Sequence, residues 1–409
     1  MADNIIARKN ANWQANSVLP DVSKTPMGGV MLPVPYPVTS PLAQSQGTVG
    51  TVLANKDPVW GFNPTKVPLT QGDEAGTGKG VKSGTVAKDT YPMEKSSTVK
   101  AEKTEVIRND DKVEMNGDKL SKEEEEKAKR QKCREEQVKA GQQSKNPAVR
   151  AAADRLSRNM KSMEHAKLSD HVYDPSRPPP AGWRNISNDP EALRQYALTR
   201  HELGINGTDF RAQVYEPNPA VFGSNGDYRP AVVFQGTNGV RSGSDWSNNL
   251  RESTNFHSPY YQRAVGIGNV IRATGSRVDF AGHSLGGGLA SAASQASGRF
   301  ATTFNAAGLH SRTVPGYGRQ YGNSGMVNAY HVRGDILTNA QEGSWWQTAL
   351  SPLRGLQTWA TPDAIGNKFS LPGHGTPLAR HEMSQVMEGI EGEKEQDQAT
   401  IAKDTGKEC

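Results

Sequence analysis

Short apolar runs alternate with longer amphipathic or small-residue stretches between about residue 166 and residue 391. The short runs are rich in β-branched and aromatic residues and are bounded by turn-forming residues, which predicts strands. The predicted strands are 210–215, 231–235, 278–281, 302–305, 327–332 and 368–371. Helices are predicted at 188–203, at 256–274 and from residue 285 onward. Strands that alternate with helices predict an α/β fold with a mostly parallel sheet.

The first 118 residues have a different pattern. Nine prolines fall in the first 70 residues, and proline disfavours helix because it lacks an N–H and clashes with the preceding turn. Short β-like runs at 47–53 and 104–108 are separated by glycine and proline turns. A glycine-rich loop at 72–80 lacks the spacing of a phosphate-binding loop. We therefore predict a small β-rich domain over 1–118.

Two strongly charged segments flank the predicted α/β domain. In 119–165, glutamate and lysine or arginine recur four residues apart, as in Glu125 with Lys129, with almost no apolar face. Such pairs stabilise a solvated helix, so we interpret this segment as a charged helical linker, or alternatively as a docking helix for a partner. The segment 392–409 is charged and has no periodicity, which predicts a frayed tail. The α/β domain would then occupy 166–391.

Composition narrows the class of protein. Apolar residues make up 34% of the 409-residue chain, the mean hydropathy is −0.70 and the formal net charge is +5. Basic and acidic residues are mixed, and no basic stripe interleaves with aromatic residues, which argues against nucleic-acid binding. No apolar run approaches the roughly 18 residues that a membrane span needs. The N-terminus lacks the apolar segment of a signal peptide, so export from the cytoplasm would use a route that does not read one.

A candidate nucleophile lies where a predicted strand runs into a helix of small residues. The sequence Gly282-His283-Ser284-Leu285-Gly286 matches the G-x-S-x-G pattern, in which a serine sits on a sharp strand-to-helix turn. A serine hydroxyl becomes an effective nucleophile once a base lies beside it. We therefore predict that Ser284 is the nucleophile, and that His283 points away from it and packs. The alternative is a glycine-rich turn with an idle serine.

An acid and a histidine should follow the serine in chain order. Asp335 comes just after the strand predicted at 327–332 and is the preferred acid, whereas Asp363 lies in a Thr-Pro-Asp turn and is interpreted as a cap. His381 precedes the helical apolar stripe Met383, Val386, Met387 and Ile390, so a packed element would hold it. His374, between two glycines, is the alternative base.

Two backbone groups are candidates for stabilising the oxyanion that forms when a serine attacks an ester. Leu285 begins the predicted helix, and its N–H is one of the donors that a helix start leaves without an internal partner. Thr237 follows the strand predicted at 231–235 and can offer both its N–H and its hydroxyl. We expect Thr237 and Leu285 to form the oxyanion site together.

The C-terminal motifs resemble those of class 3 lipases. That family has F-R-G-T, then D-W-x-x-N, then G-H-S-L-G-G, and this chain has FQGT at 234–237, DWSNN at 245–249 and GHSLGG at 282–287. Gln235 replaces the family's arginine. The resemblance implies an α/β-hydrolase fold, hydrolysis of lipid esters, no metal or other cofactor, and a mobile lid, for which 255–261 and 345–356 are candidates.

The first 118 residues resemble the PAAR-like domains that cap the spike of bacterial type VI secretion machines. The resemblance rests on VSKTPMGGVMLPVPYPV at 22–38 and GDEAGTGKGVKSGT at 72–85. PAAR folds are usually held by a zinc ion, but this chain has no histidine before His165 and no cysteine before Cys133. Cys409 is the other cysteine, so we predict neither a disulfide framework nor a zinc site.

Together the two resemblances imply a type VI lipase effector. Its expected partners are a spike protein, a cognate immunity protein and membrane phospholipid, and its expected destination is the periplasm of a target cell. Two other functions stay open on the sequence alone. The chain could be an esterase of small soluble esters, or a non-catalytic, spike-associated binding protein.

Overall fold

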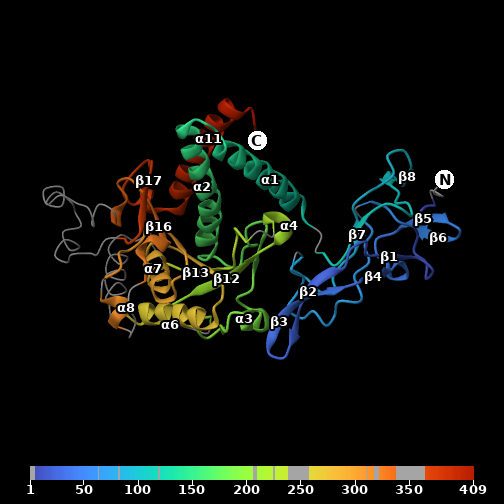
Figure 1. The fold of residues 1–409 in the computed structure, drawn as a ribbon, viewed down its shortest axis with the longest axis horizontal. Helices are drawn as coiled ribbons and strands as arrows, with labels where there is room; N and C mark the ends of the chain where they lie inside the picture. Colours follow the sequence, from blue (N-terminus) through green and yellow to red (C-terminus); the bar gives the residue numbers. More distant parts are fainter. Residues whose placement is uncertain are drawn as a thin grey trace. The chain divides into compact units, whose positions relative to one another are not determined.

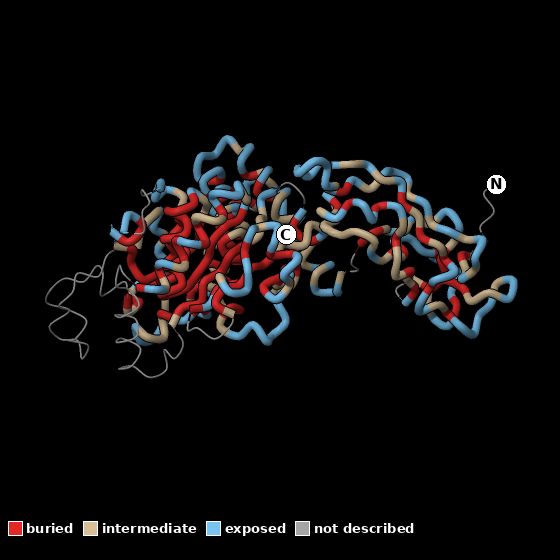
Figure 2. The backbone as a smooth tube through the Cα atoms, turned by 90° about the horizontal axis from the view of Figure 1, so that it is seen from below, coloured by how far each residue is buried: buried red, intermediate tan, exposed pale blue. Residues whose placement is uncertain are grey.

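The computed structural model describes residues 5–62, 64–81, 83–117, 120–205, 210–223, 226–237, 258–310, 312–316, 322–337 and 364–409. The chain divides into two compact units (Figure 1). Unit 1 comprises Met1–Glu126 with Asn218–Asn225, and unit 2 comprises Lys127–Pro217 with Gly226–Cys409. Each unit has buried residues of its own (Figure 2).

Unit 1 is built from short antiparallel strand pairs. The pairs are β1 (Gln14–Asn16) with β4 (Thr39–Pro41), β2 (Asp21–Met27) with β3 (Val30–Tyr36), β5 (Val49–Ala54) with β6 (Asp57–Val59), β7 (Tyr91–Pro92) with β10 (Val113–Glu114), and β8 (Lys100–Ala101) with β9 (Thr104–Glu105). Two short helices, η1 (Leu42–Gln44) and α4 (Pro219–Phe222), belong to the unit. Its core centres on Trp60, Val67 and Ile107. The unit is β-rich, as the proline pattern predicts.

A polar network ties distant parts of unit 1 together. The Asn116 Nδ2 donates to Asp21 Oδ2 at 2.5 Å and to Asp73 Oδ2 at 2.6 Å. The Asn116 Oδ1 accepts from the Lys88 N–H at 2.9 Å. Burial raises the pKa of Asp73, whose carboxylate also accepts from the Ala87 N–H. These bonds join segments up to 95 residues apart in sequence. Among the described residues, no group of three or more His, Cys, Asp or Glu is placed to hold a metal ion.

Unit 2 is organised around a seven-stranded sheet in which spatial order follows sequence order. The strands are β11 (Trp183–Asn185), β12 (Ala212–Pro217), β13 (Ala231–Phe234), β14 (Asp279–His283), β15 (Ala301–Phe304), β16 (Val327–Val332) and β17 (Asn367–Leu371). The strand β12 runs antiparallel to both of its neighbours, β11 and β13, and β13 to β17 run parallel. The prediction of an α/β fold with a mostly parallel sheet is confirmed.

Helices cover both faces of this sheet (Figure 1). On one face α6 (Pro259–Thr274) and α7 (Leu285–Ser297) pack together and bury a large core that includes Phe234 and Phe280. On the other face α2 (Pro147–His171) and α11 (Met383–Thr405) bury a second core with Phe304 and Tyr330. Further described helices are α1 (Lys122–Gln142), α3 (Pro190–Arg194), α8 (Thr313–Gly316), η2 (Ser324–Met326) and η4 (Ala379–His381). No described helix is both long and apolar enough to cross a membrane.

The predicted helix over 188–203 is too long. The Asp189 side chain caps α3 by accepting from the N–H groups of Glu191 and Ala192. The helix ends at Arg194, and Ala197 adopts a φ of 52°. A left-handed residue cannot continue a right-handed helix. The remaining residues to 205 form turns.

The segment 119–165 is largely helical, as predicted, but the prediction that it is a solvated linker is wrong, as is the prediction of a frayed tail over 392–409. Most of both segments is helix that packs into unit 2. In α2, Ala152, Ala153 and Leu156 are fully buried, and Ile401 of α11 is buried in the same cluster. Charged residues of α11 also face α2: Asp397 is buried and pairs with Arg155 at 2.5 Å. Small alanines let the helices approach closely, and paired charges replace an apolar stripe. The interface between α2 and α11 is therefore buried although the sequences of both helices are largely polar.

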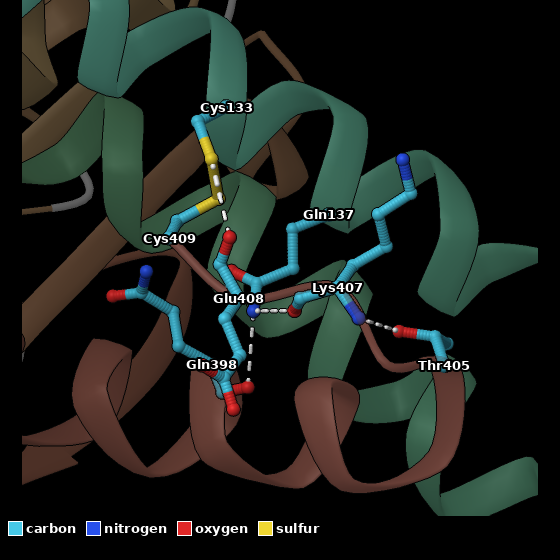
Figure 3. The surroundings of a disulfide bond; sticks show 7 residues. All are labelled: Cys133, Gln137, Gln398, Thr405, Lys407, Glu408 and Cys409. Atoms are coloured by element: carbon cyan, nitrogen blue, oxygen red, sulfur yellow. Dashed lines mark hydrogen bonds between the residues drawn. A yellow bond between two sulfur atoms is a disulfide. The ribbon is translucent and has the colours of Figure 1, made fainter.

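A disulfide joins Cys133 of α1 to Cys409, with sulfur atoms 2.16 Å apart (Figure 3). Beside it, the Gln137 side chain donates to the backbone oxygens of Gln398 and Lys407 at 3.1 and 2.8 Å (Figure 3). The prediction that the two cysteines form no disulfide is wrong. They are separated by 276 positions, and only the folding of α11 back along α1 and α2 brings them together.

Reducing this disulfide should destabilise unit 2. A cross-link restricts the unfolded chain, and its loss commonly lowers the free energy of unfolding by about 2–4 kcal/mol. We expect thermal unfolding to shift to lower temperature when dithiothreitol is added. The double variant Cys133→Ser/Cys409→Ser should unfold at that lower temperature with or without reductant. An identical melting temperature for the oxidised and reduced wild type would contradict the expectation.

Candidate active site

The serine of the G-x-S-x-G motif lies at the junction of β14 and α7. Ser284 has φ 57° and ψ −126°, a conformation that is costly for a residue with a side chain. A Cβ at Gly282 would lie 2.2 Å from the Gly286 carbonyl oxygen, and one at Gly286 would lie 2.2 Å from that of Phe234. Glycine is therefore required at both positions, as the motif predicts. The Ser284 Oγ is buried and has no hydrogen-bond partner among the described residues.

The structure brings Asp335 and His381 into direct contact. The His381 Nδ1 lies 2.6 Å from the Asp335 Oδ1, and both side chains are almost fully buried. Asp335 follows β16 through a tight turn, and its other carboxylate oxygen accepts from the Leu337 N–H at 3.1 Å. His381 ends η4, immediately before α11. A buried carboxylate on Nδ1 orients an imidazole and leaves its Nε2 for proton transfer.

The backbone of His381 is held beside the serine turn by two side chains that the sequence does not mark as functional. The His283 Nε2 lies 2.6 Å from the His381 carbonyl oxygen, and the two rings have centroids 4.7 Å apart. The Asn305 Nδ2 donates to the carbonyl oxygens of Arg380 and His381, and its Oδ1 accepts from the Val332 N–H at 2.9 Å. Asn305 therefore links the histidine loop to the strand that precedes Asp335.

The two candidate oxyanion donors belong to segments that adjoin Ser284. Leu285 is the first residue of α7. Thr237 follows Gly236 just beyond β13, and a Cβ built on Gly236 would lie 3.3 Å from the Ser284 Cβ. The Thr237 hydroxyl is buried and has no hydrogen-bond partner among the described residues. Both segments are thus close enough to the serine to contact an ester bound there.

Other candidates lie apart from this cluster or outside the described residues. His374 is exposed, and its backbone N–H donates to the Gln385 side chain at 2.9 Å. Asp363, the 245–249 motif, the 345–356 lid candidate and residues 255–257 of the other lid candidate are not among the described residues. The structure therefore pairs Asp335 with His381 and bonds the His381 backbone to His283, the residue before Ser284, whereas His374 is exposed and bonds elsewhere.

Two buried histidines should make unit 2 sensitive to acid. Burial lowers the pKa of His283 to about 3 and that of His165, which also faces Asp279 and Lys161, to about 4. Because an unfolded histidine titrates near 6.5, the unfolded state binds more protons below that pH. We expect the stability present above about pH 6.5 to fall as the pH drops toward 4.

Urea unfolding at pH 7 and pH 5 measures this effect. The variant His165→Gln, which cannot take up a proton, should lose less stability between the two pH values than the wild type. An unchanged difference in that variant would assign the acid sensitivity to other groups.

Comparisons with known proteins agree with this arrangement. Residues 164–387 match the model of the Tle-like phospholipase domain. The match spans more than half of the chain, which therefore belongs to the family of Tle-like phospholipase domains. Residues 14–121 match the toxin PAAR-like domain, so the predicted fusion of a PAAR-like domain with a lipase-type domain is confirmed. The narrower class 3 lipase resemblance stays a prediction.

The chain is also similar to a curated relative, the extracellular phospholipase A1 of Serratia liquefaciens. The two sequences are 31% identical over 237 residues. The aligned region is 55% of this chain and 66% of the relative. The chain thus spans just under two thirds of that relative's length.

Proposed function

We propose that the chain is a serine hydrolase that cleaves carboxylic ester bonds of membrane phospholipids. The observation that carries the proposal is the buried Asp335–His381 pair, held next to a serine on a strained strand-to-helix turn. No other described histidine combines a buried carboxylate partner on Nδ1 with a backbone anchored to the serine turn. The family and the relative, a phospholipase A1, favour a phospholipid as the ester.

In the proposed mechanism, the Ser284 hydroxyl attacks the ester carbonyl carbon while the His381 Nε2 takes its proton. Asp335 stabilises the imidazolium that forms. The N–H groups of Leu285 and Thr237 bind the negative carbonyl oxygen. His381 then donates the proton to the departing alcohol, and afterwards takes one from the water that releases the fatty acid from Ser284.

The first test is the release of fatty acid from vesicles of phosphatidylethanolamine and phosphatidylglycerol by the purified full chain. We expect hydrolysis of these vesicles to exceed that of a short-chain, water-soluble ester. With a micelle-forming substrate, we expect the rate of hydrolysis to rise sharply above its critical micelle concentration. Hydrolysis of the soluble ester alone would favour the esterase alternative. No hydrolysis of either substrate would favour the binding-protein alternative.

Thr237 should contribute to catalysis through its hydroxyl as well as its N–H. Its buried Oγ has no partner among the described residues, so it is available to a bound oxyanion. Loss of one such donor commonly lowers kcat by about 10²–10³. We expect Thr237→Val to show a loss in this direction, and Thr237→Ser, which keeps the hydroxyl, to retain most of the activity. Equal activities would restrict the role of Thr237 to its backbone.

We further propose that unit 1 attaches the chain to a type VI spike protein and that the chain acts as an antibacterial effector in the periplasm of a target cell. The match to a toxin PAAR-like domain supports this proposal. A producing cell would need a cognate immunity protein. We expect deletion of residues 1–118 to abolish killing of target cells and to leave vesicle hydrolysis intact. Unchanged killing would contradict the delivery role.

A further inference from the structure

Three segments of the candidate site meet at one tyrosine hydroxyl. Tyr173 lies two residues beyond the end of α2, and its hydroxyl is 3.0 Å from the His283 Nδ1. The backbone of Gly236 makes a second hydrogen bond to the same hydroxyl. A Cβ at Gly236 would lie 2.3 Å from that oxygen. The tyrosine therefore contacts both the serine turn and the loop that carries Thr237.

The partners fix the direction of these hydrogen bonds. The His381 carbonyl oxygen can only accept, so the His283 Nε2, 2.6 Å away, must carry the proton. The Nδ1 of the neutral ring is then an acceptor, and the Tyr173 hydroxyl donates to it. The Gly236 N–H can only donate, and the tyrosine oxygen accepts from it.

Both side chains keep these roles over the physiological pH range. Burial lowers the pKa of His283 to about 3, and burial raises the pKa of Tyr173 above its ordinary value. Neither group therefore changes charge when His381 accepts and releases a proton. The result is a fixed series of donors from Gly236 through Tyr173 and His283 to the His381 carbonyl.

We propose that Tyr173 is a positioning residue of the hydrolytic site, which holds the oxyanion loop and, through His283, the backbone of His381 in register with Ser284. The inference rests on the proposed hydrolase function. Gly236 follows β13, His283 ends β14 and His381 ends η4. Because these residues belong to different elements, no single strand holds them together, and we assign that task to Tyr173. The hydroxyl touches none of the reacting atoms and acts through the groups it holds.

Hydrogen bonds around the end of α2 hold Tyr173 in place. His171, at the end of α2, is buried and makes hydrogen bonds through both ring nitrogens, to the Tyr215 hydroxyl at 2.8 Å and to the Arg177 carbonyl oxygen at 2.9 Å. The Tyr173 N–H bonds the Asp170 carbonyl oxygen at 3.3 Å. The end of α2 is therefore pinned to β12 and to the following turn, which gives the tyrosine a rigid base.

The variant Tyr173→Phe tests the inference, because it keeps the ring and removes the hydroxyl. It leaves the Gly236 N–H and the His283 Nδ1 without their partner, so we expect kcat on a soluble chromogenic ester to fall roughly tenfold to a hundredfold. KM should change little, because the tyrosine does not touch the substrate. The control Tyr330→Phe removes another buried tyrosine hydroxyl, which donates to Asn159 at 2.8 Å, and should leave kcat unchanged.

Two further variants separate positioning from general loss of packing. His283→Gln keeps an amide donor that can reach the His381 carbonyl, and it should retain more activity than His283→Leu. The double variant Tyr173→Phe/His283→Leu should lose less activity than the two single losses combined, because part of the effect of Tyr173 passes through His283. Additive losses, or a Tyr173→Phe variant with wild-type kcat, would overturn the proposal.

A spectroscopic measurement keeps the inference testable without any turnover. Nitrogen-15 NMR of labelled imidazoles should show His283 as the neutral Nε2–H form from pH 5 to pH 8, with an Nδ1 resonance that shifts in Tyr173→Phe. A protonated ring, the Nδ1–H form, or an unshifted Nδ1 resonance would contradict the proposal. Absence of hydrolysis by the wild type would instead overturn the hydrolase function, so the two failures are distinguishable.

Discussion

Replacing Ser284 by alanine should abolish phospholipid hydrolysis, with kcat at least about a thousandfold below that of the wild type. In the proposed mechanism the oxygen of this hydroxyl attacks the ester, and the alanine side chain has no atom that could take its place. Because Ser284 Oγ has no hydrogen-bond partner among the described residues, its removal should leave the free energy of unfolding nearly unchanged. Released fatty acid and urea unfolding measure the two quantities.

A matched control comes from the same helix. Ser291→Ala replaces another buried serine of α7, and it should keep wild-type hydrolysis. A fluorophosphonate probe should label the wild type and Ser291→Ala but not Ser284→Ala. Hydrolysis by Ser284→Ala at the wild-type rate would assign the reaction to a different nucleophile or to a contaminating enzyme.

Replacing Asp335 by asparagine should lower kcat by about 10⁴. The asparagine oxygen can still accept from the Leu337 N–H, so the local fold is retained. Its amide group, however, would face the His381 Nδ1 with a donor in place of an acceptor. The imidazole would then be held in the tautomer that protonates Nε2, the atom required to accept the serine proton.

The alternative base provides the control for this second prediction. His374 is exposed and lies outside the buried pair, so His374→Asn should leave the pH dependence of kcat unchanged. Asp335→Asn should remove most of the activity at every pH from 6 to 9. The reverse outcome, with activity lost in His374→Asn and kept in Asp335→Asn, would move the catalytic base to His374.

The central part of the fold is predictable because its elements carry local signals. The strand at 327–332 has the predicted bounds, and the strands near 231–235 and 302–305 differ by a residue or so. Each is a short strand whose residues are buried, apart from the half-buried His331. The predictions for the charged segments 119–165 and 392–409 failed for the opposite reason. Their buried faces in α2 and in the second half of α11 include alanines and paired charges, and they show no regular apolar stripe in the sequence.

The candidate site was predictable to the extent that its residues follow strands. Ser284 and Asp335 lie just beyond β14 and β16, and His381 lies two residues before the packed helix α11, so strand ends and a helix start indicate all three. Tyr173 has no such signal. Asn305 does follow a strand, β15, but its amide side chain does not indicate a role in the site. Their roles depend on hydrogen bonds to remote segments: Tyr173 bonds the His283 side chain, and Asn305 bonds the backbone carbonyl oxygens of Arg380 and His381. Such partners cannot be inferred from the position of either residue in the sequence.

The order of elements in unit 2 also constrains how the chain can fold as it is synthesised. From β12 to β17, each strand pairs with the strand that was synthesised just before it, so the sheet can form one strand at a time. The face shared by α2 and α11 is different, because its two covering helices are the second and the last of the chain. A nascent chain would carry that face half uncovered until α11 emerges, with an apolar surface that invites aggregation or a chaperone.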